Sequence, residues 1–402
     1  MLACIVVVQV KDDNMSFLAT PLPSHTNIQQ SMLFAISALS LLSVFPTVEA
    51  GASFSQLEPI TTPRRSAAGG VVNNFNDGSP ETWVTGGSTS ESHGPVDLVE
   101  VYSLSWGDWR QEASMLQARS HHGAAPLNGN LFVGGGITDC GDQHCQTEKV
   151  EKYTPSIKTW TQVSPMNRAR KGLSFAADET SGLLYAAGGM DCMDDCSGIP
   201  VEYLATFEVY DPATDVWTSL PPMPTPRTDL SLAILNSKIY AVGGCGGDGA
   251  VQNAKNCDPL STMEMYDPDT QTWTSLGSLA LPRHGFNLAT YGSQLIAAGG
   301  SSATGIDTAS VATNLTKTVD VFDTSASATN AAWYPITVMP DPREGLVSGN
   351  LLVGISMLLI SGEAADTTLQ DTNEYMALMC SPAPPPLGKD SNLQKMLHGV
   401  SC

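Results

Sequence analysis

Two neighbouring stretches, KIYAVGG at 238–244 and MEMYDPDTQTWTSL at 263–276, contain the pattern that decides the fold. The first is a short apolar run that ends in a Gly pair, which is typical of a buried β-strand. The second begins with alternating residues, has Tyr266 near the end of that alternation and places Trp273 seven residues later. The intervening DPDTQT has the composition of a tight turn. Together they predict three consecutive strands joined by one polar connection and one turn.

The same pattern recurs along the chain at a period of about fifty residues, which indicates a repeat architecture. Other apolar runs end in a Gly pair at 83–87, 131–136, 183–189 and 294–300, and a sixth at 358–363 has Ser361 in place of the first Gly. An aromatic residue follows in every copy, and a Trp follows that residue in five copies. The aromatic residues are Tyr102, Tyr153, Tyr210, Tyr266, Phe322 and Tyr375, and the tryptophans are Trp109, Trp160, Trp217, Trp273 and Trp333.

This combination of Gly pair, Tyr and spaced Trp resembles the Kelch repeat, and the resemblance covers about residues 53 to 378. It implies a β-propeller with one four-stranded blade per repeat. We therefore expect an all-β, six-bladed β-propeller that forms one domain over residues 51–379. The sixth copy stops after its third strand, but FSQLEPITTPRRS at 54–66 aligns with WTSLPPMPTPRTD at 217–229. We expect this N-terminal strand to complete blade six, because it would cover an otherwise exposed sheet edge.

The segments outside the repeats indicate export. Residues 32–50, MLFAISALSLLSVFPTVEA, resemble a secretory signal peptide cleaved after Ala50. We therefore expect a secreted protein, preceded by an extension at 1–31 of uncertain status and followed by a Pro-rich tail at 380–402. The alternative is a membrane anchor through residues 32–48. No stretch after Ala50 is apolar enough in sequence to predict a membrane span.

Charge narrows the classes of partner. Acidic residues outnumber basic ones 40 to 19, which gives a net charge of −21. This charge disfavours nucleic-acid and anionic-membrane partners. We expect a monomer that binds an extracellular protein or glycan. Asn314-Leu315-Thr316 is a glycosylation sequon in the fifth repeat.

Cysteine spacing agrees with an oxidising compartment. Cys4 would leave with the leader, and the other eight cysteines form four near-neighbour pairs. We expect four disulfides: Cys140 with Cys145, Cys192 with Cys196, Cys245 with Cys257, and Cys380 with Cys402. Spacing alone does not fix this connectivity, and exchange of partners between neighbouring loops is the alternative pairing. Zinc is the alternative, since His144 lies beside Cys145, and calcium is an alternative at Asp191, Asp194 and Asp195. We expect no metal and no other cofactor.

The connections between strands predict which face binds. Strands alternate in direction, so the connections from strand 2 to 3 and from strand 4 to the next blade emerge on one face. The 2-3 connections are long and differ from one another, as in a recognition surface on a rigid scaffold, although unconstrained drift would look similar. The 4-1 connections each carry an arginine, which is either part of a cationic mouth or a scaffold residue. The arginines are Arg64, Arg119, Arg170, Arg227, Arg283 and Arg343.

We predict a binding site on this face and no catalytic residues. The alternative is a secreted sugar-active enzyme, similar to sialic acid mutarotases or, with less support, to galactose oxidase. The latter family needs two histidines and two tyrosines on copper, and we cannot assign that set here. The predicted binding residues are Arg65, His121, Lys171, Arg227, Asp229, His284, Arg343 and Glu344.

Overall fold

The computed structural model divides the chain into two units, Met1–Phe45 and Pro46–Cys402. The residues that it describes all belong to the second unit, and every regular element among them is a β-strand. No helix in these ranges has the length and apolar character needed to cross a membrane. The expected extension, signal segment and tail lie outside the described residues, which are 53–89, 94–139, 144–192, 201–246, 257–304, 314–325, 331–342, 352–353, 356–360 and 373–377.

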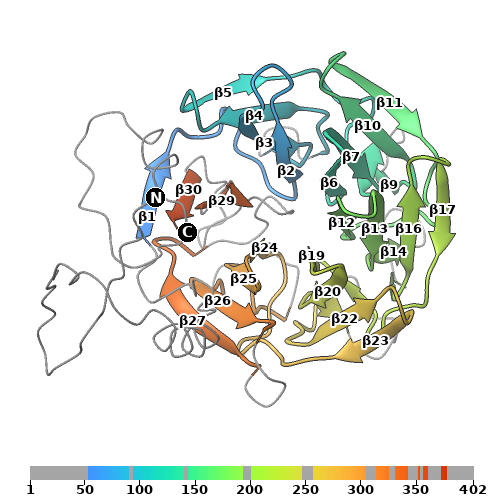
Figure 1. The fold of residues 1–402 in the computed structure, drawn as a ribbon, viewed down its shortest axis with the longest axis vertical. Coiled ribbons are helices and arrows are strands. Elements are labelled where there is room, and N and C mark those ends of the chain that lie inside the picture. Colours follow the sequence, from blue (N-terminus) through green and yellow to red (C-terminus); the bar gives the residue numbers. More distant parts are fainter. Residues whose placement is uncertain are drawn as a thin grey trace, which may run out of the picture. The chain divides into compact units, whose positions relative to one another are not determined.

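Four-stranded antiparallel blades surround the middle of this unit, as in a β-propeller (Figure 1). Five of them follow the expected order, in which the first strand lies innermost and the fourth lies outermost. Their strands are β2(Ala68–Asn73), β3(Pro80–Thr85), β4(Val99–Ser103) and β5(Asp108–Gln111); β6(Gly123–Leu127), β7(Asn130–Gly134), β10(Val150–Thr154) and β11(Thr159–Val163); β12(Ser174–Asp178), β13(Leu183–Ala187), β16(Phe207–Asp211) and β17(Val216–Ser219); β19(Ser231–Leu235), β20(Lys238–Val242), β22(Met263–Asp267) and β23(Thr272–Ser275); β24(Asn287–Tyr291), β25(Gln294–Ala298), β26(Thr318–Asp323) and β27(Trp333–Val338).

The ring thus has five blades of this kind, and not the six equivalent blades that the repeat count predicts. The sixth repeat differs because its strands come from both ends of the unit. A further four-stranded sheet has the order β1(Ser53–Leu57), β30(Asn373–Ala377), β29(Ser356–Leu359) and β28(Leu352–Val353). Strand β1 is antiparallel to β30, with Ser53 opposite Ala377 and Leu57 opposite Asn373. The expected pairing of the N-terminal strand with the sixth repeat is confirmed, but β28 has only two described residues.

The recurring aromatic residues hold neighbouring blades together. Within a blade the Tyr of the third strand packs on the Trp of the fourth, as Tyr153 does on Trp160 with ring centroids 5.1 Å apart. The indole N–H of Trp160 then donates to the carbonyl of Ala113, just after the outermost strand of the preceding blade, at 2.8 Å. Trp217 repeats this bond to Ser164 at 2.9 Å. The spacing of Tyr and Trp in the sequence therefore reports contacts both within and between blades.

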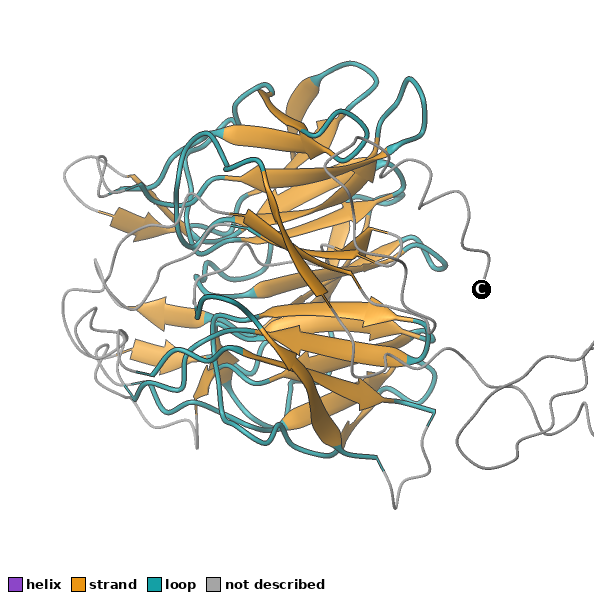
Figure 2. Ribbon diagram, turned by 90° about the vertical axis from the view of Figure 1, so that its left-hand side faces the viewer, coloured by secondary structure: helices purple, strands orange, loops and turns teal. Residues whose placement is uncertain are grey.

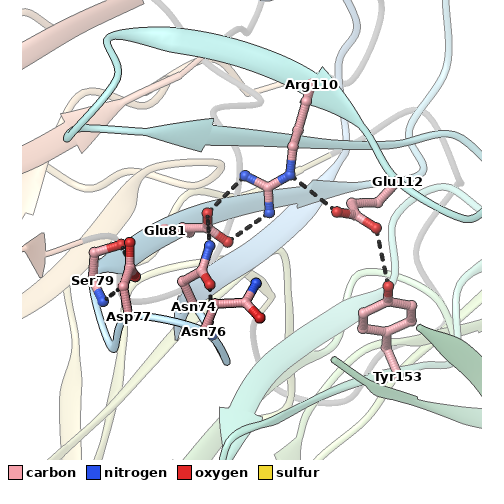
Figure 3. A network of polar contacts seen from close by, with 8 residues as sticks. All are labelled: Asn74, Asn76, Asp77, Ser79, Glu81, Arg110, Glu112 and Tyr153. Carbon is pink, nitrogen blue, oxygen red and sulfur yellow. Dashed lines mark hydrogen bonds and ion pairs between the residues drawn. The ribbon is translucent and has the colours of Figure 1, made fainter. Parts of the chain in front are cut away.

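A polar network links the first two blades at their periphery (Figure 3). Arg110 of β5 donates to both carboxylate oxygens of the buried Glu81 of β3, at 2.7 and 2.6 Å. It also donates to Glu112 at 3.0 Å, and Glu112 accepts a 3.1 Å bond from the hydroxyl of Tyr153 on β10. Charge-assisted bidentate bonds of this kind fix geometry as well as adding energy. The network therefore fixes the position of the second blade against the first.

Candidate functional site

The 2-3 and 4-1 connections lie on one face and pair with each other there. Two 2-3 connections contain two-stranded ribbons, β8(Ile137–Asp139) with β9(His144–Gln146) and β14(Met190–Cys192) with β15(Val201–Tyr203). In the fourth blade, β18(Arg227–Thr228) from the 4-1 connection pairs with β21(Cys245–Gly246) from the 2-3 connection. Short strands stand out from one side of the blades in Figure 2. The predicted shared face is confirmed.

The recurring arginines do not line a cationic mouth. The described members of the series are fully buried, and each forms an ion pair with the acidic residue of the third strand in its blade. Arg227 also donates to the carbonyls of Gly243 and Thr262, at 2.9 and 3.1 Å. Arg227 therefore belongs to the scaffold, which corrects its place among the predicted binding residues. The pairs are Arg64–Glu100, Arg119–Glu151, Arg170–Glu208, Arg227–Glu264 and Arg283–Asp320.

Two positions after each buried arginine, the backbone forms a chain of hydrogen bonds from blade to blade. From the second blade to the fifth, the residue at this position donates its N–H to the carbonyl of its counterpart in the preceding blade, as His121 does to Ser66 at 2.9 Å. Asp229 likewise donates to Gly172 at 2.7 Å. All these residues have positive φ, which glycine adopts most easily. Their φ values are 54° for Ser66, 53° for His121, 65° for Gly172, 50° for Asp229 and 60° for Gly285.

This backbone chain surrounds a small pocket. The pocket leaves about 70 Å³ for the centres of water molecules. That space holds on the order of five waters or one small polar group, since the centre of one water needs about 10–15 Å³. Ser66, His121, His122 and Asp229 are its polar lining residues. The other lining residues are Ala67, Gly172, Leu173, Leu230, Gly285 and Phe286.

The electrostatics of the pocket set the protonation of its three titratable lining residues, His121, His122 and Asp229. Burial lowers the pKa of His122 well below its usual value. His121 has Nε2 3.0 Å from the Ser66 hydroxyl, and burial together with the cations Lys171 and Arg65 lowers its pKa to about 3. Burial raises the pKa of Asp229 to about 6, although Lys171 opposes that rise. The pocket therefore holds a neutral imidazole beside a carboxyl group that titrates near physiological pH. Such groups bind hydroxyls and can exchange protons.

The other predicted binding residues are distributed differently. Arg65, His121, Lys171 and Asp229 interact electrostatically around the pocket, so the structure brings these four together. His284 is not among the pocket-lining residues: it is buried, and burial lowers its pKa to about 4. The two predicted residues of the sixth repeat, Arg343 and Glu344, lie outside the described residues.

The described cysteines agree with the predicted bridges as far as they can be followed. Cys245 and Cys257 form a disulfide with a Cα–Cα distance of 5.1 Å, which confirms that pair. Cys145 is also disulfide-bonded. Cys192 lies in β14, and the other cysteines of the predicted bridges, Cys140, Cys196, Cys380 and Cys402, lie outside the described residues. Asn314 of the sequon is exposed to solvent.

Sequence reasoning missed the blade-to-blade backbone chain and misplaced Arg227. The sequence does contain a signal for this chain. The residue two positions after the recurring arginine is glycine in three of the six repeats: Gly172, Gly285 and Gly345. Glycine at a recurring position indicates a positive φ or a close approach. At Gly172 a Cβ would lie 2.1 Å from the Thr228 hydroxyl oxygen, so this position requires both.

Comparisons with known proteins agree with this architecture. The Kelch motif matches residues 118–167, 173–224 and 226–280. Kelch-like protein terF from Aspergillus terreus is 30% identical over 236 residues, which are 58% of this chain and 48% of that protein. Beta-scruin from Limulus polyphemus is 30% identical over 188 residues, 46% of this chain and 20% of that protein. Kelch-like protein 25 from Xenopus tropicalis is 29% identical over 266 residues, which are 65% of this chain and 39% of that protein.

The fold also matches a solved structure. The structure of YjhT superposes with a TM-score of 0.61 at 17% identity, covering 78% of this chain and 94% of that one. The fold and the pairing of its connections define a β-propeller with four-stranded blades. The chain is a Kelch-repeat β-propeller. It spans less than half the length of the three curated relatives named above.

Proposed function

We propose that this Kelch propeller is a recognition module that binds a protein or glycan partner outside the cell. The partner would dock on the face that carries the 2-3 and 4-1 connections. One observation carries the proposal: the two-stranded ribbons and the polar pocket around His121 and Asp229 lie on that same face. Ligands commonly bind where variable connections stand on a rigid scaffold.

We propose further that the sheet of β1 and β28–β30 serves this scaffold in the place of a sixth blade. The indole N–H of Trp109 donates to the carbonyl of Glu58, just after β1, at 2.9 Å. This bond repeats the one that Trp160 makes to the blade before it. Ile60 also packs with Tyr102 and Ile360 in one apolar cluster. Strand β1 thus contacts the first blade in the way that a preceding fourth strand does.

An extracellular location is the part of the proposal that the cysteines support. The Cys245–Cys257 bridge and the disulfide at Cys145 suit an oxidising compartment. The exposed Asn314 is accessible for glycosylation. We expect a secreted, monomeric glycoprotein after removal of residues 32–50.

A sugar-active enzyme is the second candidate, and the pocket is the observation that favours it. Ring-opening reactions of sugars need an acid and a base within reach of one hydroxyl. The neutral imidazole of His121 and the carboxyl of Asp229 line one pocket and meet that requirement in kind. A small polar ligand that enters the pocket without turnover would meet the binding proposal equally.

One experiment separates the two candidates. The full chain, exported by a eukaryotic host, is tested for binding to arrays of glycans and secreted proteins, and for turnover of free sugars. His121→Gln and Asp229→Asn are the test variants. Trp106→Ser is the matched control, because Trp106 is 78% exposed in the β4–β5 turn on the opposite face. Binding that only the test variants weaken, without turnover, supports the recognition module; turnover that those variants abolish supports the enzyme instead.

A further inference from the structure

A second cluster of chemically competent side chains lies outside the pocket. The Sγ atoms of Cys245 and Cys257 and a ring nitrogen of His284 all lie within 4.8 Å of one another. All three residues are buried, and the two cysteines have no exposed surface. They come from three places: strand β21, the residues before the bridge at Pro259, and the connection before β24. Their convergence is therefore a product of the fold and not of one local loop.

His284 has a buried nitrogen that no described residue satisfies. The residue is 94% buried, and its Nε2 has no hydrogen-bond partner among the described residues. A buried polar atom without a partner is costly, so it calls for a ligand. The ring also hydrogen-bonds the backbone of Ala303. Metal-binding histidines usually have this arrangement, in which one ring nitrogen is anchored to the backbone and the other faces the metal.

We propose that Cys245, Cys257 and His284 form a zinc site when the two cysteines are reduced. Two thiolates and one imidazole are a known ligand set for Zn²⁺, and water would complete the tetrahedron. The charges of the site suit a buried metal. The two thiolates neutralise the charge of Zn²⁺ and the imidazole is neutral, so the complete site has no net charge and costs little to bury.

The two states of the site exchange by balanced chemistry. In the reduced protein, Zn²⁺ displaces one proton from each thiol and accepts the lone pair of the imidazole. An oxidised dithiol reagent, as electron acceptor, then takes up two electrons and two protons and becomes a dithiol. The Sγ–Sγ bond of Cys245 and Cys257 forms in the same step, and Zn²⁺ leaves. Both the disulfide and the zinc complex would join the two ends of the 2-3 connection in the fourth blade.

The inference goes beyond the proposed function, because the proposed binding of a partner requires no metal. It predicts that β21, and with it the β18–β21 ribbon, keeps its place in both oxidising and reducing compartments. A simple disulfide would hold this connection only after export.

The test uses the full chain produced in two hosts, one with a reducing cytoplasm and zinc in the medium, the other with an oxidising secretory route. Zinc content is measured by elemental analysis, and thiol occupancy by differential alkylation with peptide mapping. His284→Gln removes the proposed third ligand. His144→Gln is the control, because His144 neighbours Cys145 at a different disulfide. A cobalt titration of the reduced protein reports thiolate ligands by their charge-transfer absorption.

We expect one zinc per chain in the reduced protein and none in the oxidised one, with Cys245 and Cys257 protected from alkylation by zinc. His284→Gln should weaken zinc binding at least about 100-fold, since even outer-shell partners contribute 10–100-fold. His144→Gln should leave binding unchanged. Loss of zinc with His144→Gln alone, or free alkylation of Cys245 and Cys257 in the presence of zinc, would overturn the proposal. Thermal unfolding of each variant checks that lost binding is not lost folding.

Discussion

Arg227 Nη2 lies 3.0 Å from the carboxylate oxygen Oε2 of Glu264, and both side chains are almost completely buried. The same pair recurs in every blade that the structure describes completely, so it is part of the repeat itself. Desolvating both charges is expensive, and this pair persists because the Arg227 guanidinium is also bonded to two backbone carbonyls. The arginine series therefore fixes the 2-3 and 4-1 connections from inside the protein, where its side chains are fully buried.

Removing one partner of this pair should destabilise the protein strongly. Arg227→Met leaves Glu264 buried without its cation, so we expect the free energy of unfolding to fall by about 3–5 kcal/mol. Arg227→Met combined with Glu264→Leu should recover part of that loss, because no charge is then left unpaired. Denaturant titration measures both changes. Arg168→Met is the control: Arg168 pairs with Asp191 and Glu202 near the surface, and its loss should cost about 0–1 kcal/mol.

Glycines with positive φ should tolerate substitution only where space allows. At Gly188, with φ of 66°, an added Cβ would lie 2.5 Å from the Arg227 carbonyl oxygen. At Gly292, with φ of 56°, nothing lies within 4 Å of the added atom. Both Ala variants place a Cβ in the left-handed backbone region, which destabilises the fold by about 1–2 kcal/mol, and Gly188→Ala also introduces a steric clash. We expect Gly188→Ala to lower the melting temperature clearly more than Gly292→Ala, and equal effects would refute the packing argument.

The hydrogen bonds that the indoles donate between blades should contribute measurably to the free energy of unfolding. Trp217→Phe removes the N–H that donates to Ser164, so we expect a loss of about 1 kcal/mol for the bond and somewhat more for the smaller ring. Trp106→Phe is the matched control, because that indole is exposed. Chemical denaturation of the two variants beside the parent protein gives the comparison. A cost at Trp106 as large as that at Trp217 would show that the bond between blades contributes nothing.

Stability should depend on pH through His121. Its pKa is about 3 in the folded protein and near 6.5 in the unfolded chain. Between those values the unfolded chain binds a proton that the folded protein does not. His121 therefore contributes stability that is complete above pH 6.5 and is lost as the pH falls towards 3.

The variant His121→Gln isolates this contribution. Between pH 7 and pH 4 we expect the variant to lose less free energy of unfolding than the parent, by about 1–3 kcal/mol. His284 titrates in both proteins and cancels in the difference. The difference includes a contribution from His122, because the charge of His121 lowers the pKa of His122 in the parent protein. Parallel pH profiles would show that His121 is not desolvated in the pocket.

The sequence predicted the repeated strands well because their signals are local. The Gly pair, the alternating third strand and the Trp of the fourth each depend on neighbours within one blade. The sixth repeat was predicted less well, since β28 is short and its sheet joins residues from both ends of the unit. The role of Arg227 could not be read from its position, because a recurring arginine suits either a scaffold or a mouth. Its buried partner, Glu264, lies 37 residues later and becomes visible only in the fold.

The candidate site was predicted in part for the same reason. His121, Lys171 and Asp229 were found because they follow the recurring arginine. Their convergence on one pocket depends on the ring, which brings equivalent positions of successive blades within hydrogen-bond reach. The cluster of His284 with Cys245 and Cys257 joins segments from two repeats and could not be predicted from spacing within either one.

The central claim is that the partner binds on the face of the 2-3 and 4-1 connections. Its most direct test is the affinity of the array-selected ligand for the parent protein and three variants: Glu202→Lys on β15, Asp229→Asn in the pocket, and Trp106→Ser on the opposite face. We expect the first or the second variant to weaken binding by about tenfold or more, and Trp106→Ser to leave it unchanged. Binding that is lost with Trp106→Ser and kept in both other variants would contradict the account.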